Sequence, residues 1–203
     1  MSIEIKLSKK RISYIKAMKF LNKRVEQVKN GKNKELVWIL EHPKTYTAGI
    51  TYNDKDILDK NIKILKTNRG GKITLHNPGQ IIVYFVINLN KRKKDIRKFI
   101  SVVEKSIIKF LDNFEIKATN DRKNIGIWVN NKKIAAIGLR VSRWIAFHGC
   151  SINISNNLES YNKIMPCGLD NKKITSVLEE TGQAPKKYEK KLANIFLENI
   201  NLI

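Results

Sequence analysis

Apolar residues recur at intervals of three and four along two long segments of the chain, residues 11–29 and 96–111. This spacing places them on one face of a helix, so both segments are predicted to be amphipathic helices. Gly31 is suited to end the first of them. Shorter helical patterns follow at residues 176–180 and 185–199.

Two uninterrupted apolar runs, residues 36–40 and 81–87, are typical of buried strands. Residues 125–129 and 133–137 are predicted to be strands joined at Asn130-Asn131, a pair that tolerates left-handed turn geometry. Residues 139–147 continue this β pattern up to residues 148–153.

Strands and helices therefore mix without a regular βαβ alternation, which predicts the α+β class. A length of 203 residues fits one main domain with a real core. Near Asn156 the chain changes to short, polar, turn-rich segments. We therefore expect a main α+β domain over residues 1–155 and a small C-terminal lobe over residues 156–203.

A glycine-rich stretch, residues 69–80, leads directly into the apolar run 81–87. It reads Arg-Gly-Gly-Lys-Ile-Thr-Leu-His-Asn-Pro-Gly-Gln, and it is interpreted as a loop held by a core strand, where binding sites are often built. Its paired glycines allow either close approach of a ligand or only a hairpin turn. Residues 41–49, in which His42 precedes a proline, are expected to form a second loop beside the same site.

The formal charge of +22 is the most pronounced bulk property of the chain. Lysines are spread over the whole sequence, and no basic block alternates with aromatic residues as a nucleic-acid stacking surface requires. An acidic protein partner explains the charge at least as well as a nucleic acid does. Compositional drift on ordinary solvated faces is the third interpretation.

The longest apolar run, residues 81–87, is too short to cross a bilayer, and residues 1–10 lack the apolar stretch of a secretory signal. We therefore expect a soluble cytoplasmic protein. Two cysteines and three scattered histidines form no metal-ligand pattern, so no structural metal is expected.

Cys167 lies between Pro166 and Gly168, a setting that presents a thiol on a tight turn. A catalytic cysteine needs thiolate character from a nearby cation, helix N-terminus or base. A small buried thiol in a turn fits the same residues. Lys133 enters the apolar sequence Ile-Ala-Ala-Ile, where a desolvated amine can act as a general base, although lysines at hairpin edges commonly reach to water.

Taken together, four motifs resemble the octanoyltransferases of the lipoate–protein ligase B family. They are Arg69-Gly-Gly-x-x-Thr-x-His with Pro-Gly-Gln, Lys133-Ile-Ala-Ala-Ile-Gly-Leu-Arg-Val, His148-Gly-x-x-x-Asn and Pro166-Cys-Gly. The resemblance also includes Glu41-His-Pro-x-x-Tyr-Thr-x-Gly, and it runs from the first helix to about Thr175.

The resemblance implies that an octanoyl group moves from the thioester of acyl carrier protein to a lysine of a lipoyl domain. It makes Cys167, in the C-terminal lobe, the acyl-thioester nucleophile and Lys133 the residue that favours its thiolate form. It implies a mixed-sheet sandwich of the biotin and lipoate protein ligase type, a monomer without cofactor or metal, and no nucleic-acid or membrane partner. The acceptors it implies are lipoyl domains of 2-oxoacid dehydrogenases and glycine cleavage proteins. The substrate-binding residues it implies are Arg69, Gly70, Gly71, Lys72, Ile73, Thr74, Leu75, His76, Ala136, Ile137, Gly138, Gly149, Cys150 and Ser151.

The sequence departs from the family pattern at three positions. Asn77 replaces the usual glycine after the histidine, and Leu75 replaces the usual aromatic residue before it. Cys150 stands where an apolar residue is more common, which would put a second thiol near the site. None of these departures changes the nucleophile or its base.

Three other functions remain as alternatives. An ATP-dependent lipoate or biotin ligase on the same fold would also use a glycine-rich loop and a strand lysine, but it needs no cysteine. A cysteine hydrolase would pair Cys167 with His76 or His148. A nucleic-acid-binding module would rest on the net charge alone and would bind polyanions with a steep salt dependence.

Overall fold

The computed structural model describes residues 2–121, 124–165 and 174–203, and within them it confirms the α+β class with a mixed sheet. In chain order the elements are β1 (Ile3–Leu7), α1 (Tyr14–Lys29), β2 (Glu35–Leu40), β3 (Thr45–Ala48), η1 (Asp54–Asp56), β4 (Ile64–Lys66), β5 (Ile73–His76), β6 (Gln80–Asn88), η2 (Leu89–Lys91), α2 (Ile96–Asp112), β7 (Thr119–Asn120), β8 (Ile127–Val129), β9 (Lys132–Ser142), β10 (Ile145–Asn153), η3 (Glu159–Lys163), α3 (Val177–Thr181) and α4 (Glu189–Asn201).

The larger sheet has the strand order β1-β2-β6-β10-β9-β8-β7 within the described residues. Its strands are antiparallel neighbours except for β1 and β2, which run parallel. β1 was not expected, although Ile3, Ile5 and Leu7 alternate with polar residues as strand residues do. The sheet is therefore mixed at one edge.

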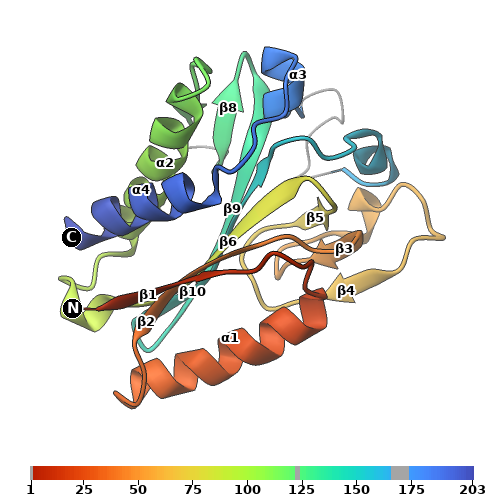
Figure 1. Cartoon of the computed structure of the whole chain (residues 1–203). Coiled ribbons are helices and arrows are strands. Elements are labelled where there is room, and N and C mark those ends of the chain that lie inside the picture. The colour runs from red at the N-terminus through yellow and green to blue at the C-terminus, as the bar shows by residue number, and fades with distance from the viewer. Residues whose placement is uncertain (1, 122–123, 166–173) are drawn as a thin grey trace.

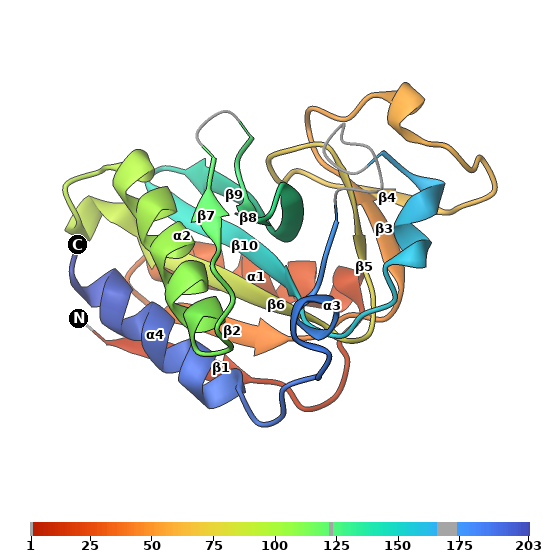
Figure 2. The same ribbon diagram turned by 90° about the horizontal axis from the view of Figure 1, so that it is seen from above.

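Helices cover both faces of this sheet. α1 lies on one face, and α2 and α4 lie side by side on the other (Figures 1 and 2). An apolar core lies between the sheet and the helices on each face, and β6 contributes to both cores. Val83 and Phe85 point to the α2–α4 side, whereas Ile82 and Tyr84 point to the α1 side. Burial on both faces explains why residues 81–87 are apolar without interruption.

A smaller sheet of the described chain, with strand order β4-β3-β5, lies beside the large one (Figure 1). β3 pairs antiparallel with β5, with Thr45 opposite His76 and Ala48 opposite Ile73. The prediction that residues 41–49 and 69–80 are only loops is therefore wrong, because each contains a short strand. Each of these strands has only four residues and is flanked by glycine and proline, which are typical of loops, so the sequence pattern does not predict a strand.

Two hairpins build the other side of the large sheet. Asn130 and Asn131, with φ values of 46° and 65°, form the predicted turn between β8 and β9. The expected continuous β run over residues 139–147 is wrong, because Arg143 and Trp144 also take left-handed φ values and turn β9 back into β10. Arginine and tryptophan are not the residues that usually mark such a turn.

The helix predictions hold, with shifted ends. Ser13 Oγ caps α1 by accepting a hydrogen bond from the Lys16 N–H, and Gly31 follows the helix with a φ of 69°. α4 begins at Glu189 rather than near residue 185, and it packs on α2 and on the β1–β2 edge. The boundary expected after residue 155 stays a prediction. None of the helices in the described ranges combines the length and the apolar character needed to span a membrane.

Candidate functional site

A pocket, here called the central pocket, lies where the loop before β5 meets β5, β9 and β10. All of the predicted substrate-binding residues except Ile73 and Leu75 line it. Segments far apart in sequence thus meet at one place. The residues that line it are Tyr14, Arg69, Gly70, Gly71, Lys72, Thr74, His76, Ile82, Tyr84, Ala136, Ile137, Gly138, His148, Gly149, Cys150 and Ser151.

Ile73 and Leu75 lie on the other face of β5. Successive side chains of a strand alternate, so Thr74 and His76 face the central pocket while their two neighbours are buried in the core of the small sheet. Leu75 therefore packs near Tyr46 rather than beside the pocket. The family departure at Leu75 falls in this core.

Asn77 stands where the family usually has glycine, but its backbone does not adopt the left-handed conformation that favours glycine. Its side-chain Nδ2 donates a 2.8 Å hydrogen bond to the backbone oxygen of Asn157. The side chain thus ties the turn before β6 to the chain after β10.

The glycine pair packs against protein backbone. A Cβ on Gly70 would lie 2.8 Å from the carbonyl oxygen of Leu139 on β9. Gly71 has a φ of 85°, and its own carbonyl oxygen would lie 2.1 Å from a Cβ on Gly49. The loop is not the hairpin turn that was one of the two expectations, because β4 and β5 each pair with β3 and not with each other. The glycines instead let the loop lie directly on β9, and close approach of a ligand stays a prediction.

Arg69 holds this loop on the small sheet. Its buried guanidinium donates hydrogen bonds of 2.9 and 3.0 Å to the carbonyl oxygen and Oγ1 of Thr47, and one of 2.9 Å to the carbonyl oxygen of Gly70. Burial is the main cause of the lowered pKa of His76 and of His148, and the nearby Arg69 charge adds to it. Arg69 therefore both fixes the loop and keeps the pocket positive.

His42 and His76 form a neutral pair, in which His76 lines the pocket and His42 lies behind it with ring centres 5.6 Å apart. His42 Nδ1 lies 2.5 Å from the carbonyl oxygen of Ile12, so it must donate, and the Tyr84 hydroxyl then donates to Nε2 at 2.8 Å. His76 Nδ1 donates at 2.8 Å to Gln80 Oε1, because the Gln80 amide nitrogen is engaged elsewhere. Burial lowers the pKa of His42 to about 4 and that of His76 to about 3.

His148 is turned into the pocket by an unusual backbone. Its φ of 64° lies in the left-handed region, inside β10, and its Nε2 lies 2.8 Å from Asn68 Oδ1. Burial, with the charges of Arg69 and Arg140, lowers its pKa to about 4. The imidazole is therefore neutral at physiological pH. The next residue must be glycine, since a Cβ on Gly149 would overlap the carbonyl oxygen of Val83.

Lys133 is buried beside the central pocket, with 5% of its surface exposed. Its Nζ lies 5.2 Å from the centre of the Trp128 ring, and a Cβ on Gly126 would lie 2.3 Å from its Cε. Lys133 lines two further cavities that share walls with the central pocket. The common wall residues are Gly70, Gly71, Lys72, Ile137 and Gly138 in one cavity and Thr74, Ala136 and Ser151 in the other.

The predicted nucleophile, Cys167, lies outside the described residues together with Pro166 and Gly168. Its relation to Lys133 therefore stays a prediction. Cys150, by contrast, is buried in the main core, and burial strongly raises the pKa of its thiol. Its thiolate is disfavoured, so it is poorly suited to attack a thioester. Within the described ranges, no group of histidine, cysteine and acidic side chains is arranged to hold a metal ion.

Four residues that the sequence analysis did not single out also belong to this site. Tyr14, Ile82 and Tyr84 line the central pocket, and Asn68 holds His148. Tyr14 is the first residue of α1 and Tyr84 sits in a core strand. Nothing in their local sequence marks them, since only the fold brings α1 to the pocket.

Comparisons with known proteins give one consistent result. The profile of the lipoyl protein ligase A/B catalytic domain matches residues 13–196. An octanoyltransferase from Wolbachia sp. subsp. Brugia malayi is 44% identical over 188 residues, which cover 90% of this chain and 92% of the relative.

Two solved structures share the fold at low sequence identity. A lipoate-protein ligase A bound with ATP aligns with a TM-score of 0.76 at 12% identity, covering 98% of this chain and 86% of that one. A bipartite lipoate protein ligase from Thermoplasma acidophilum, studied with its E2 lipoyl domain, aligns with a TM-score of 0.69 at 12% identity, covering 98% and 85%.

Proposed function

This chain belongs to the lipoyl protein ligase A/B catalytic domain family, and from that membership we propose that it is an octanoyltransferase of lipoate biosynthesis. The observation that carries the proposal is the 44% identity to an octanoyltransferase along almost the whole of both chains. We further propose that the donor is the thioester of octanoyl-acyl carrier protein. The acceptor is then the lysine amine of a lipoyl domain.

The reaction runs through a thioester on Cys167. The Cys167 thiolate attacks the donor carbonyl, and the carrier leaves as a thiol after it gains a proton. The acceptor amine then attacks the Cys167 thioester, forms the amide and releases the cysteine. A thioester is already activated, so neither step consumes ATP.

Lys133 is the proton acceptor and donor of both steps. Its burial beside Trp128 and Gly126 keeps water away from the amine, and the cavities it lines adjoin the central pocket. A general base in this place can take the proton first from the thiol and later from the incoming amine. The central pocket would hold the octanoyl chain against Ala136, Ile137 and Tyr84.

Backbone N–H groups near Gly70, Gly71 and Gly138 are suited to stabilise the tetrahedral oxyanion. The loop before β5 presses directly on β9 there, so these groups lie at the wall shared by the central pocket and a cavity lined by Lys133. Such a donor contributes about 3 to 4 kcal/mol to transition-state stabilisation.

The net charge of +22 suits acidic protein partners in the cytoplasm. An acceptor of the lipoyl-domain class is supported by the archaeal relative of the same fold, which was studied with its E2 lipoyl domain. The lipoyl domains of 2-oxoacid dehydrogenases and glycine cleavage proteins are the proposed acceptors. The enzyme is proposed to act as a monomer, with residues 1–155 as its main domain and residues 156–203 carrying the nucleophile.

The test compares two donors with a purified lipoyl domain as the acceptor. Octanoyl-acyl carrier protein without ATP should octanoylate the acceptor lysine, as a mass increase of the lipoyl domain. Free octanoate with ATP should not. The opposite result, transfer only from free octanoate with ATP, would identify an adenylate-forming ligase instead.

A further inference from the structure

The central pocket has two ends, and the reacting groups belong to one of them. Lys133 lines the two cavities that adjoin the pocket, whereas Tyr14 and His148 line neither of these cavities. Lys133 is the second residue of β9, and His148 stands opposite Leu139, further along that strand. An acyl chain whose thioester lies near Lys133 therefore points its methyl end toward Tyr14 and His148.

A second hollow lies immediately beyond that far end. This α1–β4 groove has a volume of about 550 Å³ and is lined by Tyr14, Ile15, Met18, Lys19, Asn22, Leu65, Lys66, Thr67 and Asn68. Ile15, Met18 and Leu65 give it an apolar lining. The groove would therefore accept further methylene groups if it were joined to the central pocket.

Tyr14 is the residue that lines both the central pocket and the α1–β4 groove. Tyr14 therefore forms part of a partition between the two spaces. Asn68, which lines the groove, is hydrogen-bonded to His148, which lines the pocket, so this pair forms another part of the partition. Tyr14 itself is 5% exposed. The boundary between the two spaces thus consists of one aromatic ring and one polar pair.

The Tyr14 ring is held firmly in this position. It stacks on His76 with ring centres 5.9 Å apart and an angle of 13°, and it packs against His42 at 5.4 Å. Both imidazoles are fixed in turn, His42 by Ile12 and Tyr84, and His76 by Gln80. A ring supported in this way cannot easily rotate away to admit a longer chain.

We propose that Tyr14 is a specificity-determining residue that closes the far end of the acyl pocket and so limits the length of the acyl chain. This inference rests on the proposed octanoyl transfer, because it assumes that an acyl chain occupies the central pocket. It also gives the neutral pair of His42 and His76 a role, namely to hold the Tyr14 ring in place. Neither histidine needs to take part in proton transfer for this.

The test measures acylation of the enzyme by octanoyl-, decanoyl-, dodecanoyl- and tetradecanoyl-acyl carrier protein, as initial rates from intact mass. One methylene in an apolar pocket changes kcat/KM by about 10- to 200-fold. We therefore expect Tyr14→Ala to raise the dodecanoyl-to-octanoyl rate ratio by at least about tenfold. Tyr14→Phe should retain the short-chain preference, since it keeps the ring.

Two further variants test whether a raised dodecanoyl-to-octanoyl rate ratio comes from opening the partition or from a general loosening of the fold. Ile15→Ala changes the neighbouring residue of α1, which is 56% exposed and lines only the groove, so the rate ratio should stay at the wild-type value. Adding Met18→Trp to Tyr14→Ala fills the groove and should lower the raised ratio again. If thermal melting shows that Tyr14→Ala does not fold, Tyr14→Leu replaces it.

An unchanged ratio in a folded Tyr14→Ala or Tyr14→Leu variant would overturn the inference while leaving octanoyl transfer intact. A ratio raised equally by Ile15→Ala would also overturn it, because the effect would then not depend on the partition. If the wild-type enzyme accepts no acyl group from any of the four carriers, the transferase proposal itself fails, and this inference fails with it.

Discussion

The backbone N–H of Thr175 donates a hydrogen bond of 3.0 Å to the carbonyl oxygen of Lys133, and Ile174 forms a parallel bridge with the same lysine. The chain thus pairs with the buried strand lysine directly after residues 166–173, the segment that contains Cys167. Ile174 and Thr175, which follow that segment, are the residues that this pairing places beside Lys133. The partnership of Lys133 with Cys167 stays a proposal, and variants of both residues test it.

The first prediction is that Cys167 alone carries the acyl group. After mixing with octanoyl-acyl carrier protein, the wild type and Cys150→Ser should each gain one octanoyl mass. Cys167→Ala should gain none, because the other thiol is buried and its raised pKa disfavours the thiolate. An adduct that persists in Cys167→Ala but is lost in Cys150→Ser would exchange the roles of the two thiols.

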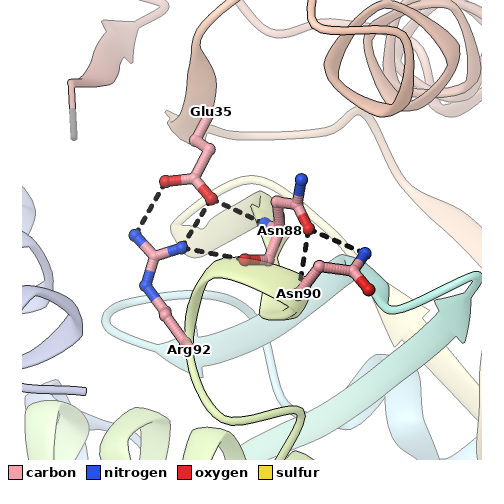
Figure 3. A network of polar contacts seen from close by, with 4 residues as sticks. All are labelled: Glu35, Asn88, Asn90 and Arg92. Atoms are coloured by element: carbon pink, nitrogen blue, oxygen red, sulfur yellow. Dashed lines mark hydrogen bonds and ion pairs between the residues drawn. The ribbon is translucent and has the colours of Figure 1, made fainter.

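The second prediction concerns a buried ion pair between Glu35, the first residue of β2, and Arg92, the residue after η2. Arg92 donates two hydrogen bonds to the carboxylate of Glu35, at 2.5 and 2.7 Å, and the backbone N–H of Asn88 donates a third at 2.6 Å (Figure 3). The two side chains are 2% and 4% exposed. Removing one partner leaves a buried charge without compensation, so Arg92→Ala should lower the free energy of unfolding by about 3 to 5 kcal/mol in urea.

A matched control is the exposed pair of Lys109 and Glu198, whose side chains are 57% and 61% exposed. Glu198→Ala should cost less than about 1 kcal/mol, because solvent screens such pairs. Replacing Glu35 and Arg92 together by methionine should restore most of the lost stability. Equal effects of Arg92→Ala and Glu198→Ala would show that burial does not strengthen the first pair.

The third prediction is a loss of stability in mild acid. His42, His76 and His148 have pKa values lowered to about 4, 3 and 4 in the folded protein, whereas an unfolded histidine titrates near 6.5. The unfolded chain therefore binds more protons below pH 6.5, and the folded state loses stability as the pH falls from there toward 4. Between pH 7.5 and 5 each histidine should cost about 2 kcal/mol.

Urea unfolding at several pH values measures this slope. His42→Asn removes one titrating group, so its stability should fall less steeply with acid, whatever its stability at pH 7.5. A His42→Asn slope equal to that of the wild type would mean that His42 has a similar pKa in the folded and unfolded states.

The fourth prediction is that salt acts mainly on the encounter with the acidic carrier. Raising ionic strength screens the +22 surface and should lower kcat/KM for octanoyl-acyl carrier protein more than kcat. Octanoyl-pantetheine, a small thioester without the carrier's acidic surface, is the control and should show little salt dependence. If salt changes neither parameter for the carrier, the basic surface is compositional drift.

The elements that the sequence predicts well are those whose pattern is long or uninterrupted. α1 and α2 keep one apolar face over four turns or more, and β6 is apolar throughout because it is buried on both sides. β3 and β5 have four residues each and gain their order from pairing with one another, which no local pattern reveals. The Arg143–Trp144 turn is set by the pairing of β9 with β10 in the same way.

The residues of the candidate site also fall into those that the sequence reveals and those that only the fold reveals. Glycines with special backbone needs and a lysine in an apolar strand are visible in the sequence, and the structure gathers them around the central pocket and its adjoining cavities. Tyr14 is an ordinary first residue of a helix until the fold sets α1 beside β5 and β6. The resemblance predicts binding segments, but it could not separate Thr74 from Ile73, whose side chains leave β5 on opposite faces.

The last prediction concerns Lys133 and separates the proposed mechanism from its rivals. Lys133→Arg keeps a cation that can favour the Cys167 thiolate, but arginine does not accept a proton. The variant therefore lacks the base that must deprotonate the incoming amine of the lipoyl domain. We expect Lys133→Arg to slow transfer to the acceptor more than it slows self-acylation, and Lys133→Ala to slow both.

Single-turnover rates of the two half-reactions decide the matter, with Lys132→Ala as the control because that neighbouring lysine is exposed on the same strand. An adenylate-forming ligase would lose adenylate formation in the Lys133 variants and would show no acyl enzyme at all. A lysine with only a structural role would reduce both rates equally in Lys133→Arg and Lys133→Ala. Wild-type rates of acylation and transfer in Lys133→Ala would rule out the catalytic pair, because no proton acceptor would then be needed at this position.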